Sequence, residues 1–71
     1  MKFDYTVLRK RIKASGMTIA EAGKITGMAN TLYRKITNRV GFSQTDIYTL
    51  SALLDIPPEE IGTVFFTPEV D

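Results

Sequence analysis

Apolar side chains recur at helical spacing along most of the chain, and glycine or proline interrupts the pattern at intervals. The first run predicts a helix over Phe3–Ser15, with Asp4 as its N-cap and Gly16 as the residue that ends it. The inward stripe of this helix consists of Tyr5, Val7, Leu8, Ile12 and Ala14. Because the apolar residues recur with the period of a helix, the pattern favours an all-α fold.

Residues 18–38 predict two helices joined by a tight turn. Thr18 and Glu21 have the spacing of a capping box, in which each side chain accepts a hydrogen bond from the other residue's backbone amide. The first helix of the pair therefore starts at Thr18 and runs to about Thr26. Gly27 ends it, because glycine adopts the left-handed conformation at no steric cost.

The second helix of the pair is expected over Ala29–Thr37. Its inward face consists of Leu32, Tyr33 and Ile36, with Met28 tucked inward just before it. Its outward face carries Asn30, Thr31, Arg34, Lys35 and Asn38. Gly23 lies inside the first helix, where a small residue lets the second helix cross closely.

The second half of the chain predicts two more short helices. The run Ser43–Asp46 is a capping box variant that starts a helix reaching about Leu54. The inward residues of this helix are Ile47, Leu50, Leu53 and Leu54. Pro58 suits the first turn of a fifth helix that Gly62 ends, and a short apolar tail follows over 63–71. The expected fold is thus a compact all-α bundle of about five short helices, in one domain spanning 1–71.

Composition removes several classes of function. The chain has 71 residues and neither cysteine nor histidine, so we expect no disulfide, no metal site and no cofactor. No glycine-rich phosphate loop follows a strand, and the carboxylates are scattered over caps and turns, so we do not expect an enzyme. No apolar run is long enough for a membrane span, and the first residues lack the pattern of a signal peptide.

Charge is divided unevenly along the chain. Residues 1–40 hold all nine basic residues and two acidic ones, a balance of +7, whereas residues 41–71 hold six acidic residues and no basic one, a balance of −6. This asymmetry suggests a basic face for a polyanion and an acidic face for another contact. The alternative is that these charges are merely solvated, since ions separated by more than about 8 Å attract one another weakly at physiological salt.

The stretch 18–38 resembles the helix-turn-helix of the lambda-repressor/Cro superfamily. In that motif a small residue precedes the turn glycine by four positions, as Gly23 precedes Gly27 here. Its later apolar positions fall on Met28, Tyr33 and Ile36. The resemblance covers the whole chain, and it implies that the second helix of the motif is a recognition helix that enters the major groove of DNA.

The resemblance also implies which residues contact double-stranded operator DNA. The positions facing bases or backbone are Ala29, Asn30, Thr31, Arg34, Lys35 and Asn38, while Lys24, Arg39 and the basic residues of the first helix would contact phosphates. Ala29 departs from the pattern because a polar residue is common there. Thr26 and Ala22 also depart from it, because larger aliphatic residues are usual at those positions.

The end of the chain carries a second resemblance. The run Ile56–Gly62, followed by Val64-Phe65-Phe66-Thr67, is similar to short Cro-like regulators of temperate phages from Gram-positive bacteria, and especially to the lactococcal-phage type called modulator of repression. This resemblance implies a place in a lysis–lysogeny switch, in the cytoplasm of a bacterial host, opposite a phage repressor.

Two hypotheses about function follow. In the first, the protein is an antirepressor that binds the repressor's DNA-binding domain through its acidic half, with Glu59, Glu60, Phe65 and Phe66 as contact residues. In the second, it is an autonomous Cro-like repressor, which would act as a homodimer because one helix-turn-helix covers a single half-site. The two activities are compatible. Adjacent Phe65 and Phe66 can hardly both point inward in so small a domain, although both could instead cover the core as a lid.

Overall fold

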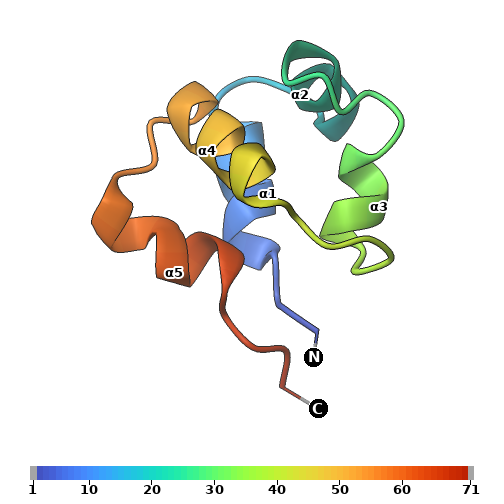
Figure 1. Cartoon of the computed structure of the whole chain (residues 1–71). Helices are drawn as coiled ribbons and strands as arrows, with labels where there is room; N and C mark the ends of the chain where they lie inside the picture. Colours follow the sequence, from blue (N-terminus) through green and yellow to red (C-terminus); the bar gives the residue numbers. More distant parts are fainter. Residues whose placement is uncertain (1, 71) are drawn as a thin grey trace.

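Short helices make up most of the computed structural model, which describes residues 2–70 (Figure 1). Met1 and Asp71, which belong to the predicted domain 1–71, lie outside the described residues. The elements are α1 (Thr6–Ala14), α2 (Ile19–Ile25), α3 (Leu32–Ile36), α4 (Gln44–Leu53), the 3₁₀-helix η1 (Pro58–Glu60) and α5 (Ile61–Phe65). The predicted all-α bundle is confirmed.

Both predicted capping boxes are present. At the start of α2, the Glu21 amide donates to Thr18 Oγ1 at 3.1 Å and the Thr18 amide donates to Glu21 Oε1 at 3.0 Å. At the start of α4, Ser43 and Asp46 exchange the same two hydrogen bonds at 3.1 and 2.9 Å. These reciprocal bonds satisfy amides that a helix leaves free, so they fix where each helix begins.

The first helix begins at Thr6, later than predicted, and the residues before it are not helical. Phe3 forms an antiparallel bridge with Pro68, and Tyr5 takes the N-cap position in place of Asp4. Asp4 still serves the helix start, since its Oδ1 accepts hydrogen bonds from the Thr6 amide at 2.9 Å and from the Thr6 hydroxyl at 2.5 Å. These bonds lower the pKa of Asp4, the hydroxyl contributing more than the amide.

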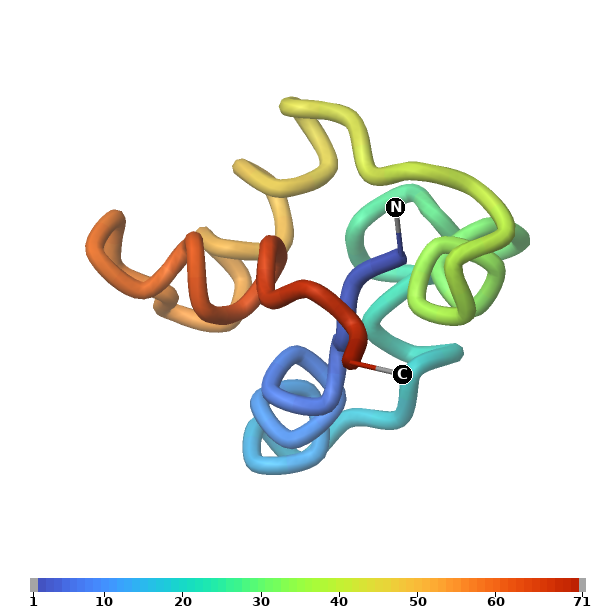
Figure 2. Tube along the Cα trace, turned by 90° about the horizontal axis from the view of Figure 1, so that it is seen from below, coloured from blue at the N-terminus to red at the C-terminus, as the bar shows by residue number. Residues whose placement is uncertain are grey.

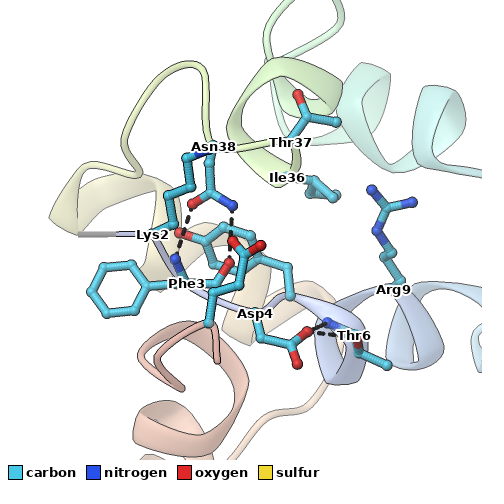
Figure 3. A pocket seen from close by; sticks show the side chains of 10 residues that line it. Lys2, Phe3, Asp4, Thr6, Arg9, Ile36, Thr37 and Asn38 are labelled. Carbon is cyan, nitrogen blue, oxygen red and sulfur yellow. Dashed lines mark hydrogen bonds between the residues drawn. The ribbon is translucent and has the colours of Figure 1, made fainter. Parts of the chain in front are cut away.

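The two ends of the described chain lie side by side (Figure 2). We call residues 2–4 the N-terminal segment and residues 66–70 the C-terminal segment. The Asp4 amide donates to the Thr67 carbonyl at 2.7 Å, and the Glu69 amide donates to the Lys2 carbonyl at 3.0 Å. On its other side, the N-terminal segment is held by the side chain of Asn38 (Figure 3).

The fifth helix is longer than predicted. Gly62 does not end it but lies inside α5, which continues to Phe65, so residues 63–65 of the predicted tail are helical. The reason is tertiary packing: Val64 and Phe65 are almost fully buried and hold the helix against the core.

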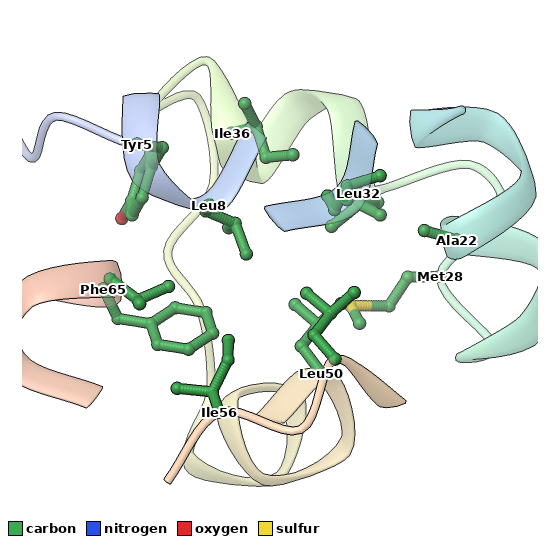
Figure 4. Packing of buried hydrophobic residues seen from close by; sticks show 12 residues of the cluster. Tyr5, Leu8, Ala22, Met28, Leu32, Ile36, Leu50, Ile56 and Phe65 are labelled. Carbon is green, nitrogen blue, oxygen red and sulfur yellow. The ribbon is translucent and has the colours of Figure 1, made fainter. Parts of the chain in front are cut away.

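The core lies where α1 meets its neighbours, with the α2–α3 pair on one side and α5 on the other (Figures 1 and 4). Its buried apolar side chains are Tyr5, Leu8, Ile12, Ala22, Met28, Leu32, Ile36, Leu50, Leu54, Ile56, Val64 and Phe65. Ala14, predicted to widen the stripe of α1, is exposed instead. Burial raises the pKa of Tyr5.

Candidate nucleic-acid interface

A close approach of two backbones sets the angle between α2 and α3. The Met28 amide donates to the Gly23 carbonyl at 2.7 Å, and Gly27 makes the turn with a φ of 76°. A Cβ atom on Gly23 would lie 2.9 Å from the Met28 carbonyl oxygen and 3.3 Å from Leu32 Cβ. The prediction that Gly23 is small because α3 crosses near it therefore agrees with the geometry.

The recognition helix α3 starts three residues later than predicted, and residues 29–31 form a turn. Met28, Leu32 and Ile36 point into the core at a spacing of four residues. Tyr33 was predicted on this inward face, and that prediction is wrong, because its side chain is 58% exposed. It lies about 100° around the helix from Leu32, on the exposed side of α3. The four-residue spacing in the sequence could have revealed this.

Several predicted DNA contacts have accessible side chains. Asn30 and Arg34 are exposed on the outer side of α3 and its leading turn, and Thr31 is half-buried between them. Lys24 on α2 and Arg39 just after α3 are also exposed. Amide, hydroxyl and guanidinium groups of this kind form the usual hydrogen bonds to base edges and phosphates. Tyr33 of α3 is also exposed, although the sequence analysis placed it on the inward face.

Lys35, unlike Asn30 and Arg34, already has a partner within the chain. Its Nζ donates to Asp46 Oδ2 at 2.7 Å, and the two side chains are only 11% and 17% exposed. Lys35 thus forms an ion pair that holds α3 against the start of α4, and the DNA contact at Lys35 stays a prediction that would have to compete with this pair. Burial raises the pKa of Asp46, but the hydrogen bonds from Lys35 and Ser43 and the charge of Lys35 outweigh that effect and lower it overall.

Asn38 also has a structural partner. The Phe3 amide donates to its Oδ1 at 3.1 Å, and its Nδ2 donates to the Phe3 carbonyl at 2.9 Å (Figure 3). The base contact at Asn38 stays a prediction, although one hydrogen bond to Oδ1 and one from Nδ2 already engage the side chain with Phe3. The residue has a φ of 64°, a conformation that asparagine tolerates better than most side chains.

Residues from both halves of the chain form a groove lined largely by aromatic rings. This aromatic groove has a volume of about 230 Å³. Its lining consists of Phe3, Tyr5, Asn38, Val40, Gly41, Phe42, Ile47, Phe65 and Phe66. The rings meet edge to face: the Phe3 and Phe66 centroids are 5.6 Å apart, and those of Phe42 and Phe65 are 5.5 Å apart.

The four residues predicted to contact a partner protein differ in how exposed they are. Phe65 is 1% exposed and closes the core beside Val64, so its partner contact, which stays a prediction, is limited to the part of the ring that lines the groove. Phe66 is 48% exposed at the rim of the aromatic groove. Glu59 is exposed, whereas Glu60 is half-buried and forms an ion pair with Arg11 of α1.

Taken together, the close crossing of α2 and α3 and the polar outer side of α3 define a small helical DNA-binding domain that acts through a helix-turn-helix. The family model described as Helix-turn-helix matches residues 8–61. The chain therefore belongs to this family, which is of the lambda-repressor/Cro type, and it is a DNA-binding transcription regulator. Domains of the family are generally not enzymes. Comparisons with curated proteins and with solved structures give no significant match.

Within the described part of the chain, no helix has the length and apolar character needed to cross a membrane.

Proposed function

We propose that this regulator is a phage-type modulator of repression, an antirepressor that binds the DNA-binding domain of a phage repressor. In the same proposal, its own helix-turn-helix contacts operator DNA. The resemblance of its C-terminal sequence to the lactococcal-phage modulator gives the class of partner. One structural observation carries the proposal, namely the aromatic groove with the exposed ring of Phe66 at its rim.

The groove has the properties of a protein-binding surface. It combines a hollow of about 230 Å³ with an accessible phenylalanine, and aromatic side chains commonly supply most of the binding energy in interfaces. Val40, at another edge of the groove, is 38% exposed and extends the apolar area. Every acidic residue but two lies in the half of the chain that contributes Phe42, Phe65 and Phe66. The lining of the groove has no charged residue, so acidic residues elsewhere in this half, such as exposed Glu59, would supply the charge that repels DNA and complements the basic DNA-binding face of a repressor.

The reduced set of DNA contacts also supports the proposal. Lys35 and Asn38 are held by other parts of the chain, and Ala29 has no polar group to offer. The base-reading positions that stay available on α3 and its leading turn are Asn30, Thr31, Tyr33 and Arg34. A narrow set of this kind favours a regulator that works together with a second DNA-binding protein.

The second candidate function is an autonomous Cro-like repressor that acts as a homodimer. Exposed Arg34 favours it, because arginine is the most common reader of guanine in the major groove. Under this alternative, Arg34→Ala lowers operator affinity by about 1–3 kcal/mol in the absence of any repressor.

A pull-down with the repressor's DNA-binding domain tests the antirepressor proposal. Phe66→Ala should weaken binding by about 2 kcal/mol, as expected for the loss of an aromatic contact residue. Tyr48→Ala is the matched control, because Tyr48 is an exposed aromatic residue on α4 outside the aromatic groove. Glu59→Lys tests the charge without disturbing the ion pair of Glu60. Equal binding by all of these variants, or no binding by the parent, would refute the role of the groove.

Gel shifts separate the two functions. This protein alone, the co-encoded repressor alone and both together are each mixed with operator DNA. An antirepressor releases or alters the repressor complex at concentrations where it gives no shift by itself. An autonomous repressor gives its own shift, which Arg34→Ala weakens, and leaves the other complex unchanged.

A further inference from the structure

The contact between Asn38 and Phe3 joins the recognition helix to the start of the chain. Asn38 follows the last turn of α3, and its side chain accepts from the Phe3 amide at 3.1 Å and donates to the Phe3 carbonyl at 2.9 Å. This pair of bonds engages both polar groups of one peptide residue, as a neighbouring strand would. It therefore fixes the direction of the backbone at Phe3 as well as its position.

The opposite edge of the N-terminal segment is held as firmly. Phe3 is bridged to Pro68, the Asp4 amide donates to Thr67, and the Glu69 amide donates to Lys2. The segment thus lies between the C-terminal segment and the end of α3. These bonds tie residues 2–4 to the DNA-binding helix on one side and to the C-terminal segment on the other.

Lys2 is placed by this arrangement. It lines a hollow of about 440 Å³ together with Arg9 of α1 and with Thr37 and Asn38 at the end of α3 (Figure 3). Lys2 is exposed, and exposed Arg39 directly follows Asn38. Two cationic side chains, Lys2 and Arg39, therefore flank the C-terminal end of the recognition helix.

We propose that Asn38 is a positioning residue of the DNA interface: it holds the N-terminal segment beside the end of α3, so that Lys2 contacts a phosphate next to the recognition helix. A helix in the major groove has the sugar–phosphate backbone at its ends, and such flanking contacts fix its register. Because the backbone of Lys2 is already held, binding orders little more than one side chain. The inference rests on the DNA-binding class of the protein and not on the repressor partner.

Two carboxylates line the same hollow and must be considered. Asp4 is engaged by the amide and hydroxyl of Thr6, which direct it toward the start of α1. Glu69 lies on the C-terminal segment and is exposed, so its charge opposes that of a phosphate. Glu69→Gln should accordingly tighten DNA binding, in the opposite direction to the loss of Lys2.

The test is the salt dependence of binding to a short mixed-sequence duplex, measured by fluorescence anisotropy for the full chain. Lys2→Gln should reduce the slope of log affinity against log salt by about 0.9, the value for one phosphate contact. Asn38→Gly removes both bonds to Phe3 and keeps a residue suited to a positive φ. It should reduce the slope by a similar amount. In the Asn38→Gly background, Lys2→Gln should then have little further effect.

Each outcome decides the proposal. If Lys2→Gln leaves the slope unchanged, Lys2 is no contact. If Lys2→Gln has the same effect in both backgrounds, Asn38 is not what positions it. Lys2→Gln changes an exposed side chain and preserves the fold, so it decides the contact even if Asn38→Gly does not fold. A parent that binds no duplex also overturns the inference, whereas the proposed repressor contact is judged separately by the pull-down.

Discussion

The carboxylate of Asp46 connects two helices through one oxygen atom. Its Oδ2 accepts from Lys35 Nζ of α3 at 2.7 Å and from the Ser43 amide at the start of α4 at 2.9 Å. The same residue thus caps α4 and fixes α3 against it. Sequence spacing revealed the cap, which is local, but not the ion pair, which depends on how the two helices pack.

Asp46 should make the stability of the domain depend on pH. Its pKa is lowered in the folded state, so its stabilising effect is complete above the ordinary aspartate pKa of about 4 and is lost as the pH falls through the lower folded value. Urea unfolding of the parent should therefore show a free energy of unfolding that falls as the pH drops below about 5. Asp46→Asn should be less stable near neutral pH and should lose less on acidification. An equal loss in both proteins would contradict this role.

Ser51 is a residue whose replacement should help the fold. Its side chain is buried, and its Oγ has no hydrogen-bond partner within residues 2–70. An unsatisfied buried hydroxyl carries a desolvation cost, so Ser51→Ala should raise the free energy of unfolding by up to about 1 kcal/mol. Ser43→Ala is the matched control: it removes a serine that caps α4 and should lower stability by about 1 kcal/mol. Chemical denaturation of both variants gives the comparison.

At the level of helices, Gly23 and Gly62 show how helix propensity and packing can have opposite effects on stability. Gly23→Ala favours the helical state of α2 but places a methyl group 2.9 Å from the Met28 carbonyl, so we expect a net loss of about 1–3 kcal/mol. Gly62→Ala in α5 meets nothing within 4 Å and should stabilise the domain by about 0.5–1 kcal/mol. Thermal melts monitored by circular dichroism distinguish the two. If both substitutions stabilise, the crossing of α2 and α3 is looser than described.

Sequence patterns predicted the helices well where the signal was local. Both capping boxes and the turn glycine at position 27 are such signals, and the helix starts and turn that they predict agree with the structure. The patterns failed where distant residues decided the outcome. Gly62 stayed helical because Val64 and Phe65 are buried, and Phe3 became extended because Pro68 lies beside it. Neither partner could be identified from spacing alone.

In the candidate DNA interface, too, the sequence predicted local features but not contacts between distant residues. The exposed positions of Asn30 and Arg34 follow from the outward side of the motif, which a sequence comparison can locate. By contrast, Lys35 pairs with Asp46, which lies 11 positions later in the chain, and Asn38 bonds to Phe3, which lies 35 positions earlier. A polar residue on an outward face therefore defines a candidate contact, and only the fold shows whether it is still available.

For the molecule as a whole, two adjacent phenylalanines have opposite roles. Phe65 is 1% exposed and is among the largest fully buried side chains. Phe65→Ala should cost about 3–5 kcal/mol, which is most of the stability expected for so small a domain. Phe66 is 48% exposed, so Phe66→Ala should cost about 1 kcal/mol or less and leave the protein folded for binding assays. If denaturation curves show that Phe66→Ala is less stable than Phe65→Ala, then Phe66 and not Phe65 is the ring that fills the core.

The packing of α1 against α5 has a consequence for how the protein folds. The α2–α3 pair closes through short loops and can form early, whereas α1 packs against α5 only when residues far apart in the sequence meet, as Phe3 and Pro68 do. A partly folded chain in which α5 has not yet docked leaves the places of Val64 and Phe65 in the core open to water. Such a chain exposes an apolar surface that favours aggregation until α5 closes the core.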